Sequence, residues 1–78
     1  MQQLNKNRLF MYCVEYFKKT VDMPWTCEST MLVSDYRMQR IVRLAKLFGY
    51  TYNKERKTYC LDTPQASLQI VIRKHKIK

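Results

Sequence analysis

The sequence predicts a small α+β domain in which three helices are followed by a β-hairpin and a third strand. The first observation behind this fold class is that apolar side chains recur at helical spacing in three segments before Gly49. The second is that β-favouring residues alternate after Gly49, the only glycine of the chain. With 78 residues, the chain is expected to form one domain over 1–78 that ends in a basic tail over about 73–78.

The segment 35–48 carries the clearest helical pattern. Some of its apolar residues recur at helical spacing and form one stripe: Met38, Ile41, Val42, Ala45 and Phe48. Ser34 or Asp35 can cap the N-terminus, because a short side-chain oxygen accepts hydrogen bonds from the free backbone N–H groups there. Gly49 is expected to end the helix, since glycine adopts a left-handed conformation without steric cost.

Two earlier segments are also predicted to be helical. Over 4–20, the apolar inner face follows a helical spacing and consists of Leu9, Phe10, Cys13, Val14 and Phe17. This face is expected to pack against the stripe of 35–48, with Phe17 in the core. Pro24 interrupts the pattern, and Thr26 then suits the N-cap of a short second helix over 26–33.

The segment that follows Gly49 has the two-residue period of β-structure. The alternating residues are Tyr50, Thr51, Tyr52, Thr58, Tyr59, Cys60 and Leu61, so a hairpin is expected over 50–61 with its tip at 54–56. The β-branched run in 67–73 favours a third strand. The alternative for this last part is a C-terminal helix over 64–78, opened by Thr63 as N-cap and Pro64 in the first turn.

The charge of the chain narrows its expected partners. Fifteen Lys and Arg against six Asp and Glu give a net charge of +9, which favours nucleic acid or an acidic protein. The apolar run 9–14 is too short to span a membrane, and no membrane partner is expected. Three cysteines without a visible secretory signal predict reduced thiols in a cytoplasmic protein.

The sequence gives little support for a catalytic site or a metal site. His75, the only histidine, lies in the basic tail, which is a poor place for a positioned general base. No two of the three cysteines lie at the short spacing of a zinc knuckle, since they are Cys13, Cys27 and Cys60. We therefore expect no enzyme, no metal site and no cofactor.

The face of 35–48 opposite the apolar stripe carries cations, amides and one aromatic residue. Its only carboxylate is Asp35, at the end where the helix dipole favours an acid. A basic helix face can simply be solvated, but this one adjoins a basic hairpin, which favours a polyanion. Arginine can also bond guanine, and glutamine adenine, in a DNA groove. The candidate nucleic-acid contacts are Tyr36, Arg37, Gln39, Arg40, Arg43, Lys46, Lys54, Arg56, Lys57, Lys74 and Lys76.

The stretch 26–61 resembles the second half of a winged helix-turn-helix domain. The resemblance rests on the helix that ends in Leu44-Ala45-Lys46-Leu47-Phe48-Gly49-Tyr50 and on the hairpin strands 51–53 and 57–61. It implies a recognition helix over 35–48, a two-stranded wing, and double-stranded DNA as the partner. It further implies a transcription regulator or a small architectural factor, such as a phage-type repressor or an excisionase-like protein.

Two other functions remain open at this point. A small inhibitor or adaptor could grip an acidic protein through the same cationic surface. An RNA- or ribosome-binding protein could stack single-stranded bases on Tyr50, Tyr52 and Tyr59 if these rings face outwards. The sequence sets neither the oligomeric state nor the target sequence.

Overall fold

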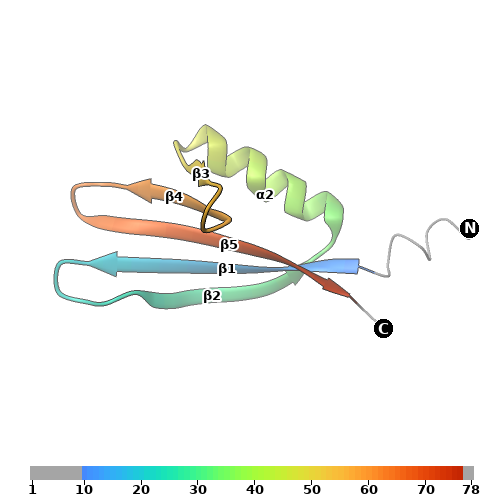
Figure 1. The fold of residues 1–78 in the computed structure, drawn as a ribbon, viewed down its shortest axis with the longest axis horizontal. Helices are drawn as coiled ribbons and strands as arrows, with labels where there is room; N and C mark the ends of the chain where they lie inside the picture. Colours follow the sequence, from blue (N-terminus) through green and yellow to red (C-terminus); the bar gives the residue numbers. More distant parts are fainter. Residues whose placement is uncertain (1–9, 77–78) are drawn as a thin grey trace, which may run out of the picture.

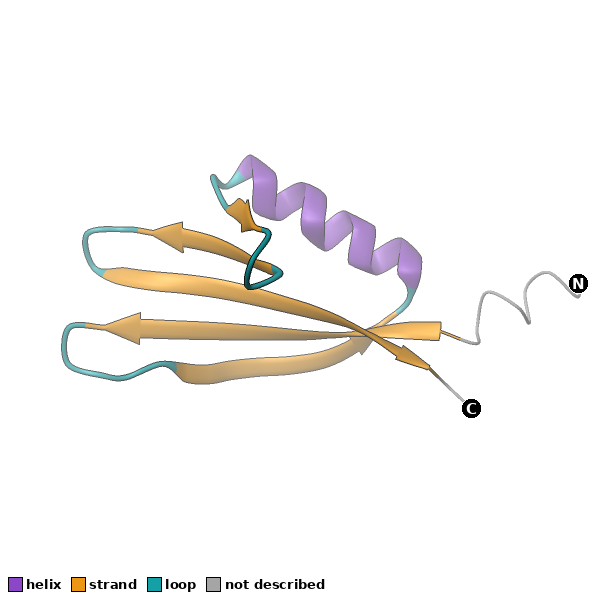
Figure 2. Ribbon diagram, in the orientation of Figure 1, coloured by secondary structure: helices purple, strands orange, loops and turns teal. Residues whose placement is uncertain are grey.

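The computed structural model describes residues 10–76, which form a five-stranded antiparallel sheet with a helix over one of its faces (Figure 1). The strands are β1 (Phe10–Thr20), β2 (Thr26–Val33), β3 (Thr51–Asn53), β4 (Thr58–Asp62) and β5 (Ala66–Lys76), and the helix is α2 (Asp35–Leu47). The spatial order is β2-β1-β5-β4-β3. The chain therefore crosses from one edge of the sheet to the other through α2 (Figure 2).

The predicted winged-helix fold of three helices and a hairpin is wrong, because 10–20 and 26–33 are strands of the sheet. β1 pairs with β2 on one side and with β5 along its whole length on the other. Tyr12, Val14 and Tyr16 pack on the side of α2, so the residues between them face the opposite side. The apolar residues that recur at helical spacing thus belong to both faces of one strand.

The start of β2 explains why the second helix does not form. Thr26 was expected to accept hydrogen bonds as an N-cap, but its Oγ1 instead donates to the carbonyl oxygen of Pro24 at 3.0 Å. That bond belongs to the turn between β1 and β2. The remaining part of the expected first helix, 4–9, lies outside the described residues.

The elements predicted after residue 34 are largely confirmed. The hairpin of β3 and β4 and the third strand, β5, are both present. The alternative C-terminal helix is wrong, because Thr63 and Ala66 instead close the turn between β4 and β5. The Thr63 Oγ1 accepts from the Ala66 N–H at 3.0 Å and donates to the Ala66 carbonyl at 2.9 Å. Most of the expected basic tail, 73–76, belongs to β5, and 77–78 lie outside the described residues.

Both ends of α2 follow the predicted signals. Ser34 has an extended backbone, and its Oγ accepts from the Arg37 N–H at 3.4 Å, so it is the N-cap. Asp35 lies in the first turn, where the positive end of the helix dipole stabilises a carboxylate. Gly49 follows the helix with φ of +102°, a conformation that side chains rarely adopt.

The core lies between α2 and the middle of the sheet, and it is small. Its buried apolar residues are Val14, Val33, Ala45 and Ile70. Ile41 packs against this cluster as expected, but two expected members are absent. Phe48 is 72 % exposed, and Phe17 is only half-buried, on the face away from α2. The side chain of Phe10 is outside the described set.

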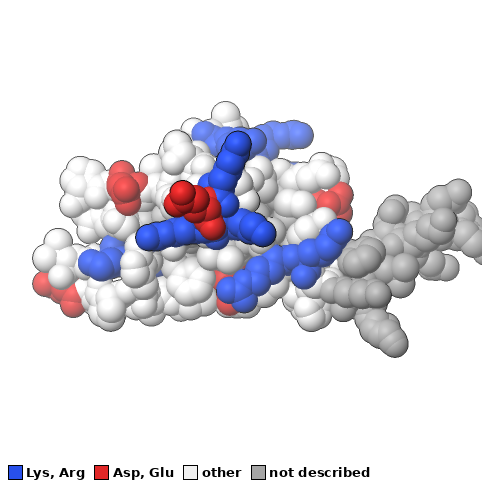
Figure 3. Space-filling model, viewed as in Figure 1, with Lys and Arg blue, Asp and Glu red and all other residues white. Residues whose placement is uncertain are grey.

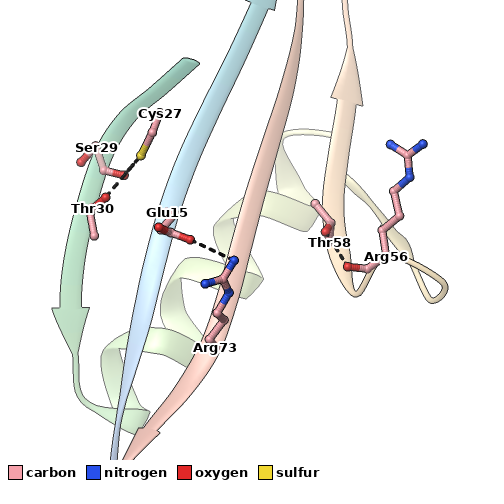
Figure 4. A network of polar contacts seen from close by, with 7 residues as sticks. All are labelled: Glu15, Cys27, Ser29, Thr30, Arg56, Thr58 and Arg73. Atoms are coloured by element: carbon pink, nitrogen blue, oxygen red, sulfur yellow. Dashed lines mark hydrogen bonds and ion pairs between the residues drawn. The ribbon is translucent and has the colours of Figure 1, made fainter. Parts of the chain in front are cut away.

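The second face of the sheet is not covered by any element within residues 10–76. Glu15 and Arg73 meet on this face, with Glu15 Oε1 and Arg73 Nη2 3.6 Å apart (Figure 4). Within the same described range, no helix is both long and apolar enough to cross a bilayer.

Candidate nucleic-acid interface

The predicted contact residues of α2 all have exposed side chains: Tyr36, Arg37, Gln39, Arg40, Arg43 and Lys46. The helix buries Ala45 and half-buries Met38, Ile41 and Val42. Because residues three and four positions apart share one side of a helix, the exposed residues divide into two flanks. One flank holds Arg37, Arg40 and Leu44, and the other holds Gln39, Arg43 and Lys46.

The first flank lies over β1 and β2. Arg37, Arg40 and Leu44 line a cleft of about 360 Å³, together with Tyr16, Met31, Val33 and Ile41. The second flank is therefore turned toward the half of the sheet that contains β3, β4 and β5. That half also carries the basic hairpin turn, so the fold brings Arg43 and Lys46 to the same side as the turn.

The cations of α2 are not neutralised by neighbouring acids. The ion pair between Glu15 and Arg73 lies on the other face of the sheet, and no ion pair involves an α2 cation within residues 10–76. Asp35 accepts a hydrogen bond from Gln39 Nε2 at 3.0 Å. Gln39 is thus held against its own helix, which reduces its freedom to contact a base edge. Arg40, Arg43 and Lys46 are exposed to solvent.

The turn between β3 and β4 presents three further cations, Lys54, Arg56 and Lys57, all exposed. Two side chains fix its shape. Asn53 Oδ1 accepts from the Arg56 N–H at 3.0 Å, and Thr58 Oγ1 donates to the Arg56 carbonyl oxygen at 2.8 Å (Figure 4). Lys57 takes the left-handed conformation, with φ of +55°, that glycine would usually supply. The turn is therefore a defined cationic projection, although Glu55 also lies in it.

The end of β5 adds charge beside this turn. Thr58 pairs with Val71, so the turn before Thr58 extends along β5 toward residues 73–76. Lys74 is exposed and pairs with Tyr12 of β1. Tyr12 also pairs with Val33, the last residue of β2, so Lys74 lies two strands away from the start of α2. Lys76 lies at the end of β5, and its side chain is not described. Figure 3 shows cationic side chains over α2, at the turn and along the end of β5 on one side of the molecule.

An apolar patch that the sequence did not predict lies at the C-terminal end of α2. Leu47 and Phe48 are 76 % and 72 % exposed, and Leu44 is also exposed. The signal for Leu47 was present, because it lies outside the apolar stripe of the helix. Arginines interleaved with large apolar side chains are typical of protein-binding surfaces.

The tyrosines near the hairpin do not form an open stacking platform. The rings of Tyr52 and Tyr59 pack across the hairpin, with centroids 4.8 Å apart and planes tilted by 54°. Tyr50 and Tyr59 are half-buried against the core. Burial raises the pKa of the Tyr50 hydroxyl, and the nearby Tyr16 raises it further. Burial likewise raises the pKa of Tyr59, with a smaller contribution from Tyr52.

No disulfide joins any two of the cysteines, which are Cys13, Cys27 and Cys60. In the part of the chain that the structure describes, no three His, Cys, Asp or Glu residues gather as metal ligands would. Comparison of the chain with protein-family models, curated proteins and solved structures finds no match.

Proposed function

We propose that the protein binds double-stranded DNA through a cationic face made of Arg40, Arg43, Lys46, Lys54, Arg56 and Lys57. The observation that supports this most is the exposed, unneutralised charge of α2 on the side that adjoins the hairpin turn. Each cation that meets a phosphate releases a counterion, which gives affinity for any duplex. The finer role would be that of a small architectural or regulatory factor in the cytoplasm.

The fold changes the mode of binding from the one the sequence suggested. A recognition helix in a winged-helix arrangement is not available, because that arrangement is wrong. α2 rests along the sheet, so its exposed side meets a partner broadside together with the turn. Contacts of this kind favour the phosphate backbone over base edges, and the expected sequence preference is weak.

A duplex is the better partner than single-stranded nucleic acid. Binding of single strands relies on aromatic rings that are free to stack on bases. Here Tyr50 and Tyr59 are half-buried, and the tilted rings of Tyr52 and Tyr59 pack against each other. The cations, in contrast, project from a helix and a fixed turn, which suits a regular array of phosphates.

The test is a salt titration of binding to one labelled duplex. Arg43→Ala or Lys54→Ala should leave the fold intact, weaken binding and flatten the dependence of log K on log salt by about one unit for each lost phosphate contact. Lys19→Ala is the matched control, since Lys19 is an exposed cation on the face away from α2. No duplex binding by the wild-type chain at low salt would refute the proposal. Equal losses in Lys19→Ala and Arg43→Ala would show that only net charge matters.

A second candidate function is that of an inhibitor or adaptor of an acidic protein. The observation in its favour is the exposure of Leu47 and Phe48 beside the arginines of α2. Apolar side chains contribute little to phosphate binding but commonly anchor protein interfaces. Phe48→Ser should therefore leave duplex binding unchanged and abolish nuclease-resistant capture of a protein. If Phe48→Ser has no effect on any captured protein, this candidate loses its support.

A further inference from the structure

The outer edge of β2 is open in the described part of the chain. β2 pairs only with β1 and is the last strand on its side of the sheet. Apart from Val33, its residues are exposed. The backbone N–H and C=O groups on its outer side are therefore free to pair with another strand.

Among the usual protections against pairing, this edge has a β-bulge, which is confined to the first half of β2. Natural sheets commonly block exposed edges with lysine, proline or very short strands. β2 has eight residues, contains no Lys, Arg or Pro, and carries Glu28 as its one charge. The pairing of β2 with β1 shifts in register opposite Tyr16 and Phe17, and residues 29–33 of β2 keep a regular register. The other edge, β3, is only three residues long and runs into the cationic turn.

The cleft between α2 and β2 lies directly beside this edge. Met31 and Val33 alternate on the α2 side of β2 and form part of its floor. Arg37, Arg40 and Leu44 line it from the helix. A strand added to β2 would direct every second side chain toward this cleft, because side chains alternate between the two faces of a sheet.

We infer that the β2 edge and this cleft form a docking groove for an extended, acidic segment of a partner protein. The segment adds to the sheet as a sixth strand next to β2. Its cleft-facing carboxylates pair with Arg37 and Arg40, and its apolar side chains contact Met31 and Leu44. Backbone pairing supplies affinity and the cleft supplies specificity, as in other cases of strand addition.

The charges favour this occupant over a second copy of the chain. In an antiparallel pair of two β2 strands, Arg37 and Arg40 of both copies would approach the same seam. Each copy carries a net charge of +9, and β2 offers only Glu28 in return. An acidic segment removes this repulsion and neutralises arginines that have no carboxylate partner among the described residues.

The first experiment measures binding of a peptide library to the full chain. Its members are short blocked peptides in which Asp or Glu alternates with Val, Ile or Thr. The tightest member should bind at least about tenfold more weakly to the Arg37→Ala, Arg40→Ala double variant. The matched control is Arg43→Ala with Lys46→Ala, which removes the same charge from the opposite flank and should leave peptide binding unchanged.

The second experiment separates strand addition from simple charge attraction. Methylation of every second backbone nitrogen of the peptide keeps its charge but removes the donors on one edge, so one of the two methylation registers should abolish binding. Amide hydrogen exchange should slow at 29–33 when the unmodified peptide binds. Absence of any binding library member would overturn the inference. Equal binding of both methylated forms, protection elsewhere, or a concentration-dependent dimer of the chain that closes the β2 edge would also overturn it. These outcomes do not depend on whether the cationic face binds DNA.

Discussion

Replacement of Val14 by alanine tests the placement of the core most directly. Val14 is fully buried, at 0 % exposure, between β2, β5 and the Ala45 side of α2. The change removes two buried methyl groups, worth about 1.6 kcal/mol at roughly 0.8 kcal/mol for each carbon. The cavity left behind adds to this loss, so we expect a total of about 2–3 kcal/mol. A domain of this length has roughly 4–12 kcal/mol of stability, so the loss is a large fraction.

The assay is urea unfolding followed by far-ultraviolet circular dichroism. Val21→Ala is the matched control, because it makes the same chemical change at a side chain that is 91 % exposed. Its effect should stay within about 0.5 kcal/mol. If Val14→Ala and Val21→Ala unfold at the same urea concentration, β1 does not present Val14 to the core, and the strand register is incorrect.

Three further outcomes follow from single residues. Burial raises the pKa of Tyr16, so the folded state favours its neutral form. The stability that this burial contributes should be fully present below the ordinary tyrosine pKa of about 10 and should be lost as the pH rises through the higher pKa of the folded state. Urea midpoints that stay constant across this pH range would contradict the prediction. Gly49→Ala should cost about 1 kcal/mol or more in urea unfolding because φ is +102°, and a neutral or stabilising effect would rule out this conformation. Cys27 is exposed, whereas Cys13 and Cys60 are half-buried, so a thiol reagent should modify Cys27 first. Mass spectrometry of the modified protein measures this order, and earlier modification of Cys13 or Cys60 would contradict the placement of the strands.

The helix and hairpin could be predicted because their signals are local. Ser34 caps α2 and Gly49 ends it, and both act on backbone groups within a few residues. The alternation around Tyr52 and Tyr59 likewise belongs to one short hairpin. Each of these segments can be assigned without knowing what lies against it.

The conformation of β1 depends on partners far along the chain. Its neighbour β5 begins at Ala66, and their pairing sets the strand conformation of the whole segment. Val14 is buried under α2, whereas Phe17 is half-buried on the uncovered face, so apolar residues occur on both faces of β1. The resulting pattern matches helical spacing by coincidence. Only the β-favouring residue types, such as Tyr12 and Tyr16, pointed to a strand.

Some features of the candidate site likewise depend on local sequence, and others depend on contacts between distant segments. Exposed cations could be found from the sequence, because they lie opposite the apolar stripe of one helix. The exposure of Phe48 could not, since it depends on how α2 lies against a sheet built from distant segments. The cleft and the open β2 edge could not be predicted either, because the sequence of 26–33 favours a helix and hides the strand that forms them.

The two proposed surfaces share Arg40, and this makes them mutually dependent. Arg40 belongs to the cationic face and also lines the cleft beside β2. A duplex across α2 would draw Arg40 outwards, whereas an acidic strand would hold it over β2. Both partners are negatively charged, so each also repels the other across the width of one helix.

An acidic peptide bound at β2 should therefore weaken duplex binding, and the duplex should weaken peptide binding by the same factor, as linkage requires. A fluorescence titration of the duplex at several peptide concentrations measures this factor. Arg40→Ala should reduce it, and full independence of the two ligands would show that at least one of these surfaces is not where we place it.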